Sequence, residues 1–336
     1  MTSVNPSRQH TEQGDLRRIG LELEFAGIDL ETAARIIQQL YGGDIVHNHR
    51  YEIVVEQTEL GDFRVELDAR ILRKMANRDI LSKWGIDFDE QSIRDSIEQV
   101  LDRIAMTVIP LEIVMPPVPI TELDKLEPVR EELEANKAEG TGVSFMNAFG
   151  LHMNIESPSL SQTSILQYLR SFLIIYPWLL EKLHIDISRR ISPFIDHFPT
   201  AYVEKILNPE YDPDQKTMVS DYLHHNPTRN RPLDLLPILA MLEPELVQSA
   251  IRDEKNKPRP AFHYRLPNSR IDDPEWSFTE EWNRWQIIEN LQSDPEMIRR
   301  LSKLYLFNRG STLLSFRREW ATTISILLDL DDETQT

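Results

Sequence analysis

Short runs in the first half of the chain alternate apolar and polar residues, which is the pattern of a β-strand with two different faces. The first run is Gly20-Leu21-Glu22-Leu23-Glu24-Phe25. Successive side chains of a strand point to opposite faces, so the leucines and the phenylalanine share one face. Glu22 and Glu24 lie side by side on the other. Two neighbouring carboxylates repel each other unless a cation lies over them, which makes this run a candidate metal site.

Five later runs show strand character, and their polar positions carry a narrow set of residue types. The runs are residues 52–57, 63–71, 110–117, 150–156 and 262–266. A short connection containing Gly61 joins the first two and predicts a hairpin. The polar positions are Glu66, Asp68, Glu112, His152, Asn154, Glu156, His263 and Arg265.

Helical periodicity takes over in the second half of the chain. Asp29 is a predicted N-cap for a helix from residue 30 that stops at Gly42-Gly43, and residues 89–107 and 121–138 are also predicted helices. Residues 161–250 read as helical with proline breaks, the first at Pro177, and helices return after residue 279. The pattern predicts an α+β fold with a largely antiparallel sheet and a helical second half packed around it. We expect a flexible tail over residues 1–17, one domain over 18–328 with a helical insertion at about 161–250, and a polar tail over 329–336.

The amino-acid composition limits which binding partners and which kinds of chemistry are expected. The 336 residues carry a net charge of −18, with 55 acidic against 37 basic residues, which argues against nucleic acid or an anionic membrane as partner. The chain has no cysteine, so disulfides, thiolate metal ligands and cysteine nucleophiles are excluded. The N-terminal residues lack the apolar core of a signal peptide, and no stretch reaches the roughly 18 apolar residues of a membrane span, so we expect a cytoplasmic protein.

The polar faces of the strands allow two interpretations. An antiparallel sheet with one wet face alternates in the same way. A wet face would be expected to carry Lys, Thr, Ser and Gln, whereas these faces carry Glu, Asp, His, Asn and Arg, which bind metals and phosphates. Oxygen ligands with one or two imidazoles favour Mg²⁺ or Mn²⁺, with zinc as the second choice. With 11 glycines in the chain, phosphates would be held by metal and arginine rather than by a glycine-rich loop.

The ordered set of motifs resembles the putative amidoligase family, a relative of glutamine synthetase and glutamate-cysteine ligase. The motifs are Gly-x-Glu-x-Glu, a strand with an acid at Asp68, Leu-Glu-Ile-Val-x-Pro-Pro, Gly-Leu-His-x-Asn and Phe-His-Tyr-Arg-Leu-Pro-Asn, spread over roughly residues 18–270. The resemblance implies a glutamine-synthetase-like sheet that binds ATP and divalent metal, Mg²⁺ or Mn²⁺. It also implies attack of an amine on an acyl phosphate.

The resemblance also implies roles for particular residues. The metal ligands would be Glu22, Glu24, Asp68, Glu112, His152 and His263. Arg265 would contact phosphate, and Arg265 and Glu112 are the candidate catalytic residues. The further candidate nucleotide contacts are Asn268, Arg270 and Arg190. The chain departs from the family where His263 replaces a usual glutamate and where Asn154 stands at a position that often holds a second histidine.

The leading hypothesis is therefore an ATP-dependent ligase that joins a small-molecule or peptide carboxylate to an amine. Two alternatives stay open, which are a catalytically idle metal- or ligand-binding protein on the same fold and a zinc-dependent hydrolase. Arg259, just upstream of the last strand, is a further candidate for a nucleotide pocket. Trp276, Trp282 and Trp285 are predicted to pack under the sheet. The sequence leaves the oligomeric state open, and a homo-oligomer is compatible with it.

Overall fold

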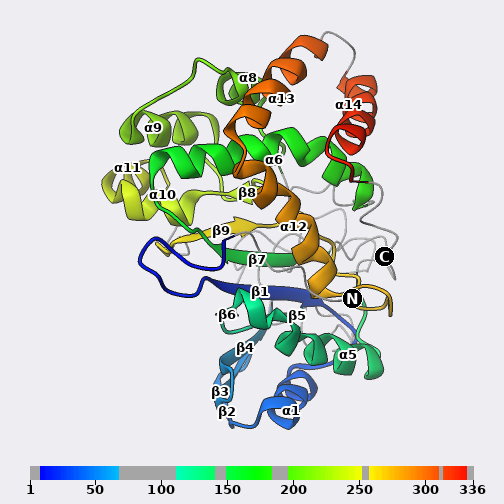
Figure 1. Ribbon diagram of the computed structural model, residues 1–336. Helices are drawn as coiled ribbons and strands as arrows, with labels where there is room; N and C mark the ends of the chain where they lie inside the picture. Colours follow the sequence, from blue (N-terminus) through cyan, green and yellow to red (C-terminus); the bar gives the residue numbers. More distant parts are fainter. Residues whose placement is uncertain are drawn as a thin grey trace, which may run out of the picture.

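The computed structural model describes residues 8–67, 111–140, 149–183, 196–251, 257–309 and 313–330, with the side chains of 313–315 excepted. Within these residues a nine-stranded sheet has the order β2-β3-β4-β5-β1-β7-β9-β8, and β6 pairs with the start of β1 (Figure 1). Every pairing is antiparallel. The strands are β1 Arg18–Phe25, β2 Asp44–His49, β3 Glu52–Thr58, β4 Gly61–Leu67, β5 Leu111–Val114, β6 Val118–Pro119, β7 Leu151–Glu156, β8 Leu233–Asp234 and β9 Ala261–Tyr264. The predicted α+β class is confirmed, and the likeness of the sheet to glutamine synthetase stays a prediction.

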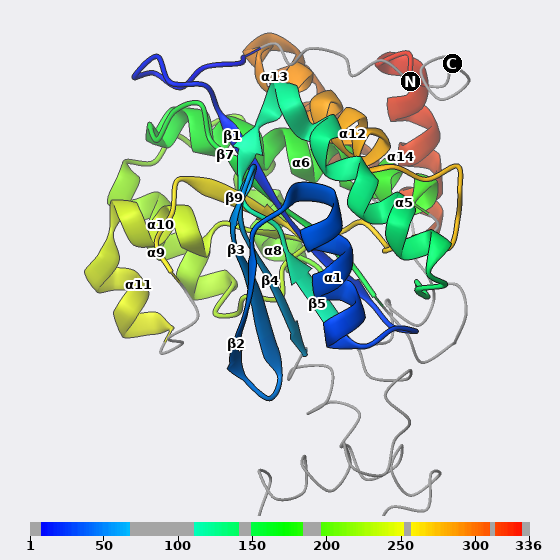
Figure 2. The ribbon, with the colours of Figure 1, turned by 90° about the horizontal axis from the view of Figure 1, so that it is seen from below.

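Helices cover the apolar face of the sheet. Tyr41 of the first helix stacks on Phe63 of β4 with ring centroids 5.2 Å apart. Tyr168 of the longest helix described packs against Phe262 of β9 with the rings tilted and their centroids 4.7 Å apart. Figures 1 and 2 show α1 and α5 at the β2–β4 end and α6 and α12 alongside β7 and β9. The helices are α1 Leu30–Tyr41, the 3-10 helix η3 Ile120–Leu126, α5 Glu127–Ala135, α6 Gln162–Lys182, α8 Thr200–Leu207, α9 Gln215–His225, α10 Leu236–Leu242, α11 Pro244–Ala250, α12 Phe278–Gln292, α13 Pro295–Asn308 and α14 Leu313–Leu327.

Local signals in the sequence account for several element boundaries. The Asp29 side chain accepts a hydrogen bond from the Thr32 backbone N–H, so it caps α1 as predicted, and the helix ends at Gly42. β3 and β4 form the predicted hairpin, with Thr58 opposite Gly61. All three tryptophans of the predicted core cluster are buried. None of the helices in the described ranges is long and apolar enough to cross a lipid bilayer.

Two expectations need correction, one strand was not predicted, and one predicted helix falls on residues that the structure does not describe. α6 continues through Pro177 instead of breaking there, because nearly its whole second half is buried and this packing outweighs one lost backbone hydrogen bond. The predicted helix over 121–138 is divided between η3 and α5. The exposed edge strand β2 was not predicted, since an edge with little buried surface shows no apolar alternation. The predicted helix over 89–107 lies outside the described residues.

The segment predicted as an N-terminal tail ends in a buried ion pair. Both side-chain nitrogens of the Arg17 fork bond the Glu289 carboxylate of α12, at 2.6 and 3.1 Å, and the two side chains are 0% and 1% exposed. The Trp285 indole N–H donates to the same carboxylate at 2.9 Å. Arg17 also donates to the backbone carbonyl of Glu156 at the end of β7. One side chain thus ties the start of β1 to β7 and to the helical layer.

Replacing Glu289 with glutamine should destabilise the protein strongly. The change leaves the Arg17 guanidinium buried without a counter-charge, which costs about 3–5 kcal/mol in comparable pairs. Urea unfolding followed by tryptophan fluorescence measures the free energy of unfolding. The control is Arg35→Ala, which removes an exposed pair with Glu31 on α1 and should cost below about 1 kcal/mol. Equal effects of the two substitutions would contradict this role for Arg17.

Candidate metal centre

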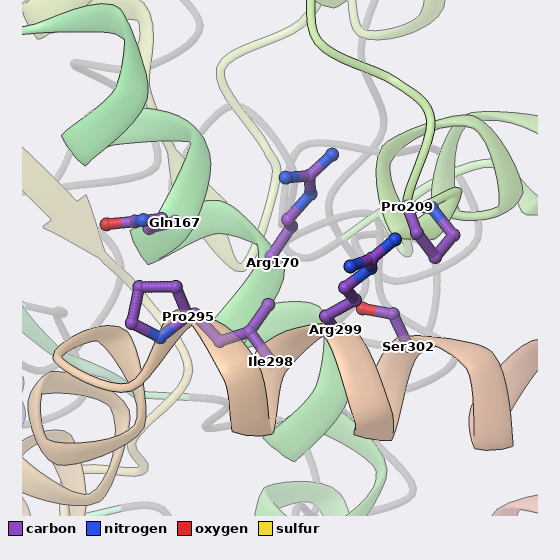
Figure 3. Close-up of a pocket in the computed structure, with 7 residues that line it drawn as sticks. All are labelled: Gln167, Arg170, Pro209, Pro295, Ile298, Arg299 and Ser302. Carbon is purple, nitrogen blue, oxygen red and sulfur yellow. The ribbon is translucent and has the colours of Figure 1, made fainter.

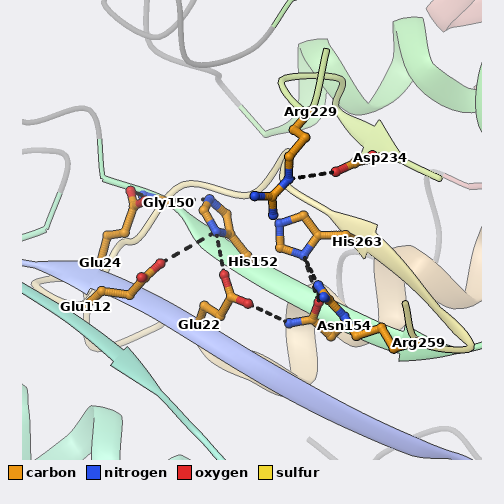
Figure 4. Close-up of polar contacts among 10 residues, drawn as sticks. All are labelled: Glu22, Glu24, Glu112, Gly150, His152, Asn154, Arg229, Asp234, Arg259 and His263. Atoms are coloured by element: carbon orange, nitrogen blue, oxygen red, sulfur yellow. Dashed lines mark hydrogen bonds and ion pairs between the residues drawn. The ribbon is translucent and has the colours of Figure 1, made fainter. Parts of the chain in front are cut away.

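The register of the central strands brings the predicted polar positions onto one face of the sheet. β1 lies between β5 and β7, with Glu24 opposite Glu112 and Glu22 opposite His152. β9 then pairs with β7, which sets His263 opposite Asn154. Figure 4 shows these side chains converging from the four strands. Since the register is fixed by backbone pairing, the cluster is a direct consequence of strand order.

The polar face is buried rather than wet. Glu24 and Glu112 are each 4% exposed, His152 is 5% exposed and His263 is 1% exposed. Taking a carboxylate out of water is costly unless it is paired or coordinates a metal. The wet-face interpretation of the alternation is therefore excluded for these four positions, and a compensating cation is the physical alternative.

The cluster contains two overlapping triads with the spacing of metal ligands. Glu22, His152 and His263 each offer a ligand atom within 4.8 Å of the others, and so do Glu24, Glu112 and His152. Ligands held at about 2.3–2.6 Å from one ion lie no more than about 5 Å apart, so either triad fits around a single cation. His152 belongs to both, with Nδ1 3.2 Å from Glu22 Oε2 and Nε2 3.7 Å from Glu24 Oε1. The Gly150 backbone N–H holds Glu24 by donating to Oε2 at 2.8 Å.

Electrostatics keep Glu22 charged and His263 neutral at neutral pH. Burial opposes ionisation of Glu22, but hydrogen bonds from His152 and Asn154 hold its pKa well below the usual range. Burial lowers the pKa of His263 well below its ordinary value, and the Arg265 guanidinium adds to the effect. A carboxylate and a neutral imidazole are the protonation states in which these groups bind metal.

Arginines lie on the β9 side of the cluster. Arg259 Nη2 donates to Asn154 Oδ1 at 2.6 Å. Arg265, 5% exposed at the end of β9, and Arg229 both act electrostatically on Asp234, which is fully buried on β8. Burial raises the pKa of Asp234, and these two arginines oppose that rise. The site is thus polarised, with carboxylates on β1 and β5 and guanidinium groups beside β8 and β9.

Four further residues were predicted to bind metal or nucleotide, and none of them belongs to the two triads. Asp68 and Arg190 lie outside the described residues. Asn268 is 6% exposed and forms an isolated bridge with Gly150, next to the Glu24 contact. Arg270 forms an ion pair with Asp273 near the surface, so the structure does not bring its guanidinium into the cluster.

Two members of the polarised site were missed from the sequence. Asp234 belongs to a two-residue strand, too short for any alternation to show. Arg229 precedes it in a loop, where no periodicity exists to place a side chain. The nearby Arg231 marks this loop as basic, but a basic loop does not show which way its side chains point.

A separate pocket of about 140 Å³ lies between α6 and α13 and shares no lining residue with the cluster (Figure 3). Arg170 lines it, but its guanidinium already donates to the backbone carbonyls of Ile206 at 2.9 Å and Tyr211 at 2.5 Å. Burial lowers the pKa of Arg170. We assign this pocket no role.

Comparison with known proteins places the chain in a family. The family model described as "Putative amidoligase enzyme" matches residues 15–287, a span that contains every strand of the sheet and the whole cluster. The chain therefore belongs to this family, which points to an amide-bond ligase. No curated protein and no solved structure matches the chain.

Replacing Glu24 with glutamine should weaken metal binding far more than stability. Glutamine can still accept the Gly150 N–H, and the change relieves repulsion with Glu112. We expect the melting temperature of the metal-free protein to stay the same or rise, and the affinity for Mn²⁺ in calorimetric titration to fall at least about tenfold.

The matched control is Glu66→Gln, which changes the same residue type one strand further along the same face, opposite Glu112. Glu66 belongs to neither triad, so its Mn²⁺ affinity should stay within about twofold. A marked loss of thermal stability in metal-free Glu24→Gln would show that Glu24 is a structural residue instead.

Proposed function

We propose that this protein is an ATP-dependent carboxylate–amine ligase. The observation that carries the proposal is the buried cluster of three carboxylates and two imidazoles, drawn from four adjacent strands and bordered by arginines. Such a site suits a complex of divalent metal and phosphates, because the cation balances the carboxylates while the guanidinium groups meet phosphate oxygens. Membership of the amidoligase family supports the reaction class.

The proposed reaction has two steps. An oxygen of the substrate carboxylate attacks the γ-phosphorus of ATP, so that a P–O bond forms, ADP leaves and an acyl phosphate results. The amine nitrogen then attacks the acyl carbon, a C–N bond forms, phosphate leaves with the bonding electron pair, and the amine gives up a proton. The substrates are a small-molecule or peptide carboxylate and an amine.

The donor set fits Mg²⁺ or Mn²⁺, which Glu22, Glu24, Glu112, His152 and His263 would hold. A bound divalent ion would supply charge neutralisation for the phosphates. Arg265 would stabilise the transferred phosphoryl group, and Arg259 would add positive charge on the same side. Glu112 would help to orient the reacting carboxylate and phosphate by holding the metal in place. The protein thus contributes positioning and fixed charges.

A zinc-dependent hydrolase is the second candidate, because one specific observation favours it. Glu22, His152 and His263 form a set of two imidazoles and one carboxylate, which is the donor set of several catalytic zinc sites. Nucleotide dependence separates the candidates. A ligase needs ATP for turnover, a zinc hydrolase does not, and an idle binding protein shows no turnover with either metal.

Thermal unfolding with and without ATP and Mg²⁺ tests the proposal directly. A ligand that binds the native state alone must raise the melting temperature. We expect ATP with Mg²⁺ to raise it more than Mg²⁺ alone. An unchanged melting temperature at millimolar ATP and Mg²⁺ would remove the ligase proposal.

Replacing Arg265 with lysine should reduce nucleotide affinity with little effect on the stability of the free protein. Lysine keeps the charge that acts on Asp234 but loses the planar fork that matches two phosphate oxygens. The loss of a charge-assisted hydrogen bond, about 1.5–3 kcal/mol, corresponds to roughly tenfold or more in affinity. Calorimetric titration with a non-hydrolysable ATP analogue and Mg²⁺ measures it.

The control for this substitution is Arg35→Lys on the exposed face of α1, which should leave nucleotide affinity unchanged. Unchanged affinity in Arg265→Lys would place Arg265 outside the phosphate site. Its role would then be that of a counter-ion to Asp234.

A further inference from the structure

Asn154 of β7 connects Glu22, His263 and Arg259 by hydrogen bonds, although an asparagine amide is a poorer metal ligand than a carboxylate or an imidazole. Its Nδ2 donates to Glu22 Oε1 at 3.0 Å. Its Oδ1 lies 2.7 Å from His263 Nδ1 and also accepts the 2.6 Å hydrogen bond from Arg259. Figure 4 shows the amide between the Glu22 carboxylate and the His263 ring.

These contacts determine which nitrogen of His263 carries its proton. A carboxylate accepts hydrogen bonds and does not donate, so the amide N–H₂ group of Asn154 must face Glu22 and the amide oxygen must face His263. The oxygen can only accept, so the proton lies on His263 Nδ1. Arg259 Nη2 is also 3.4 Å from this ring nitrogen, but it makes its short hydrogen bond, 2.6 Å, to the amide oxygen instead, and the 2.7 Å contact between Nδ1 and that oxygen decides the tautomer. His263 Nε2 is buried and has no hydrogen-bond partner among the described residues. A second proton there would be a buried donor without an acceptor, so Nε2 carries a lone pair.

The same logic extends to His152 through Glu22. The other oxygen of that carboxylate, Oε2, lies 3.2 Å from His152 Nδ1, which must therefore donate to it. The lone pair of a neutral His152 then lies on Nε2, the nitrogen that faces Glu24 Oε1 at 3.7 Å. One hydrogen-bonded chain from Asn154 thus places a proton on Nδ1 of both rings. It leaves Nε2 as the nitrogen that carries the lone pair in the neutral form of each.

We propose that Asn154 is a positioning residue that sets the tautomers of both histidines, that of His263 directly and that of His152 through Glu22, so that both present Nε2 to a cation. Histidine in water favours the opposite tautomer, with its proton on Nε2, so the protein has to enforce this form. The hydrogen bond made by one ring nitrogen decides which state the other adopts. The cation rests on the proposed function, whereas the tautomers do not.

Two-bond ¹H–¹⁵N correlation spectra of the metal-free, ¹⁵N-labelled protein identify the protonated nitrogen of each ring. His152→Gln and His263→Gln assign the two signals. We expect protonated Nδ1 in both rings of the unmodified protein. In Asn154→Ala the His263 signals should shift towards the Nε2-protonated form, and calorimetric affinity for Mn²⁺ should fall about 10–100-fold.

Two further variants sharpen the test. Asn154→Asp keeps an oxygen facing His263 but loses the donor to Glu22, so His263 should keep its Nδ1 proton while the constraint on His152 weakens. Asn308→Ala, on the exposed end of α13, should change neither ring nor the metal affinity. If Asn154→Ala does not fold, the unmodified protein and Asn154→Asp still decide the question.

The outcomes separate this inference from the proposed function. A proton on Nε2 of His263 in the unmodified protein, or tautomers that do not change in folded Asn154→Ala, would overturn the inference. Protonated Nδ1 in both rings together with no Mn²⁺ binding would support the tautomer assignment and remove the metal from the proposed function.

Discussion

Glu24 of β1 lies opposite Glu112 of β5, and the rest of the site has to compensate for the repulsion between these two carboxylates. Like charges directly opposite each other on neighbouring strands are destabilising, and both side chains are almost fully buried. The fold tolerates this because its stability comes from the other face, where α1, α6 and α12 pack aromatic and aliphatic side chains against the same strands. The Arg17–Glu289 pair then ties β1 to that helical layer. A stable apolar face allows the polar face to carry an arrangement of like charges that is unfavourable by itself.

Charge is distributed unevenly across the sheet, so the site has a negative side and a positive side. Carboxylates come from β1 and β5, guanidinium groups accompany β8 and β9, and β7 between them supplies His152 and Asn154. A net charge of −18 repels nucleotides at long range. Salt screens that repulsion beyond roughly 10 Å, so an anionic ligand responds to the local arginines once it is close. Local polarity, not overall charge, therefore decides which ligands suit the site. This is why the composition argues against nucleic acid as a partner without arguing against a nucleotide such as ATP.

Strand alternation made most of the cluster predictable, because a period of two assigns each side chain to a face without any knowledge of strand order. Glu22, Glu24, Glu112, His152 and His263 were all selected in this way, and the register then brought them together. Alternation could not find Asp234 or Arg229, which come from a two-residue strand and a loop. It also could not reveal Pro177 inside α6, since whether a proline ends a helix depends on the packing of the turns around it. Arg270, a candidate nucleotide contact two residues beyond the last motif, forms an ion pair with Asp273, a contact that no pattern in the sequence marks.

His263, at a position where the resemblance to the family implies a glutamate, has a consequence for charge balance. A glutamate there would add a fourth carboxylate to Glu22, Glu24 and Glu112 in a place that is 1% exposed. The neutral imidazole keeps a lone pair for a ligand but adds no negative charge, so one divalent cation at the proposed site, together with the nearby Arg259, would balance the three carboxylates. Burial and the charge of Arg265 lower the pKa of His263, and this keeps the ring neutral. In the proposed metal site the exchange would change one donor from oxygen to nitrogen and lower the cation charge that is needed. Of the two proposed ions this would favour Mn²⁺, which accepts nitrogen ligands more readily than Mg²⁺.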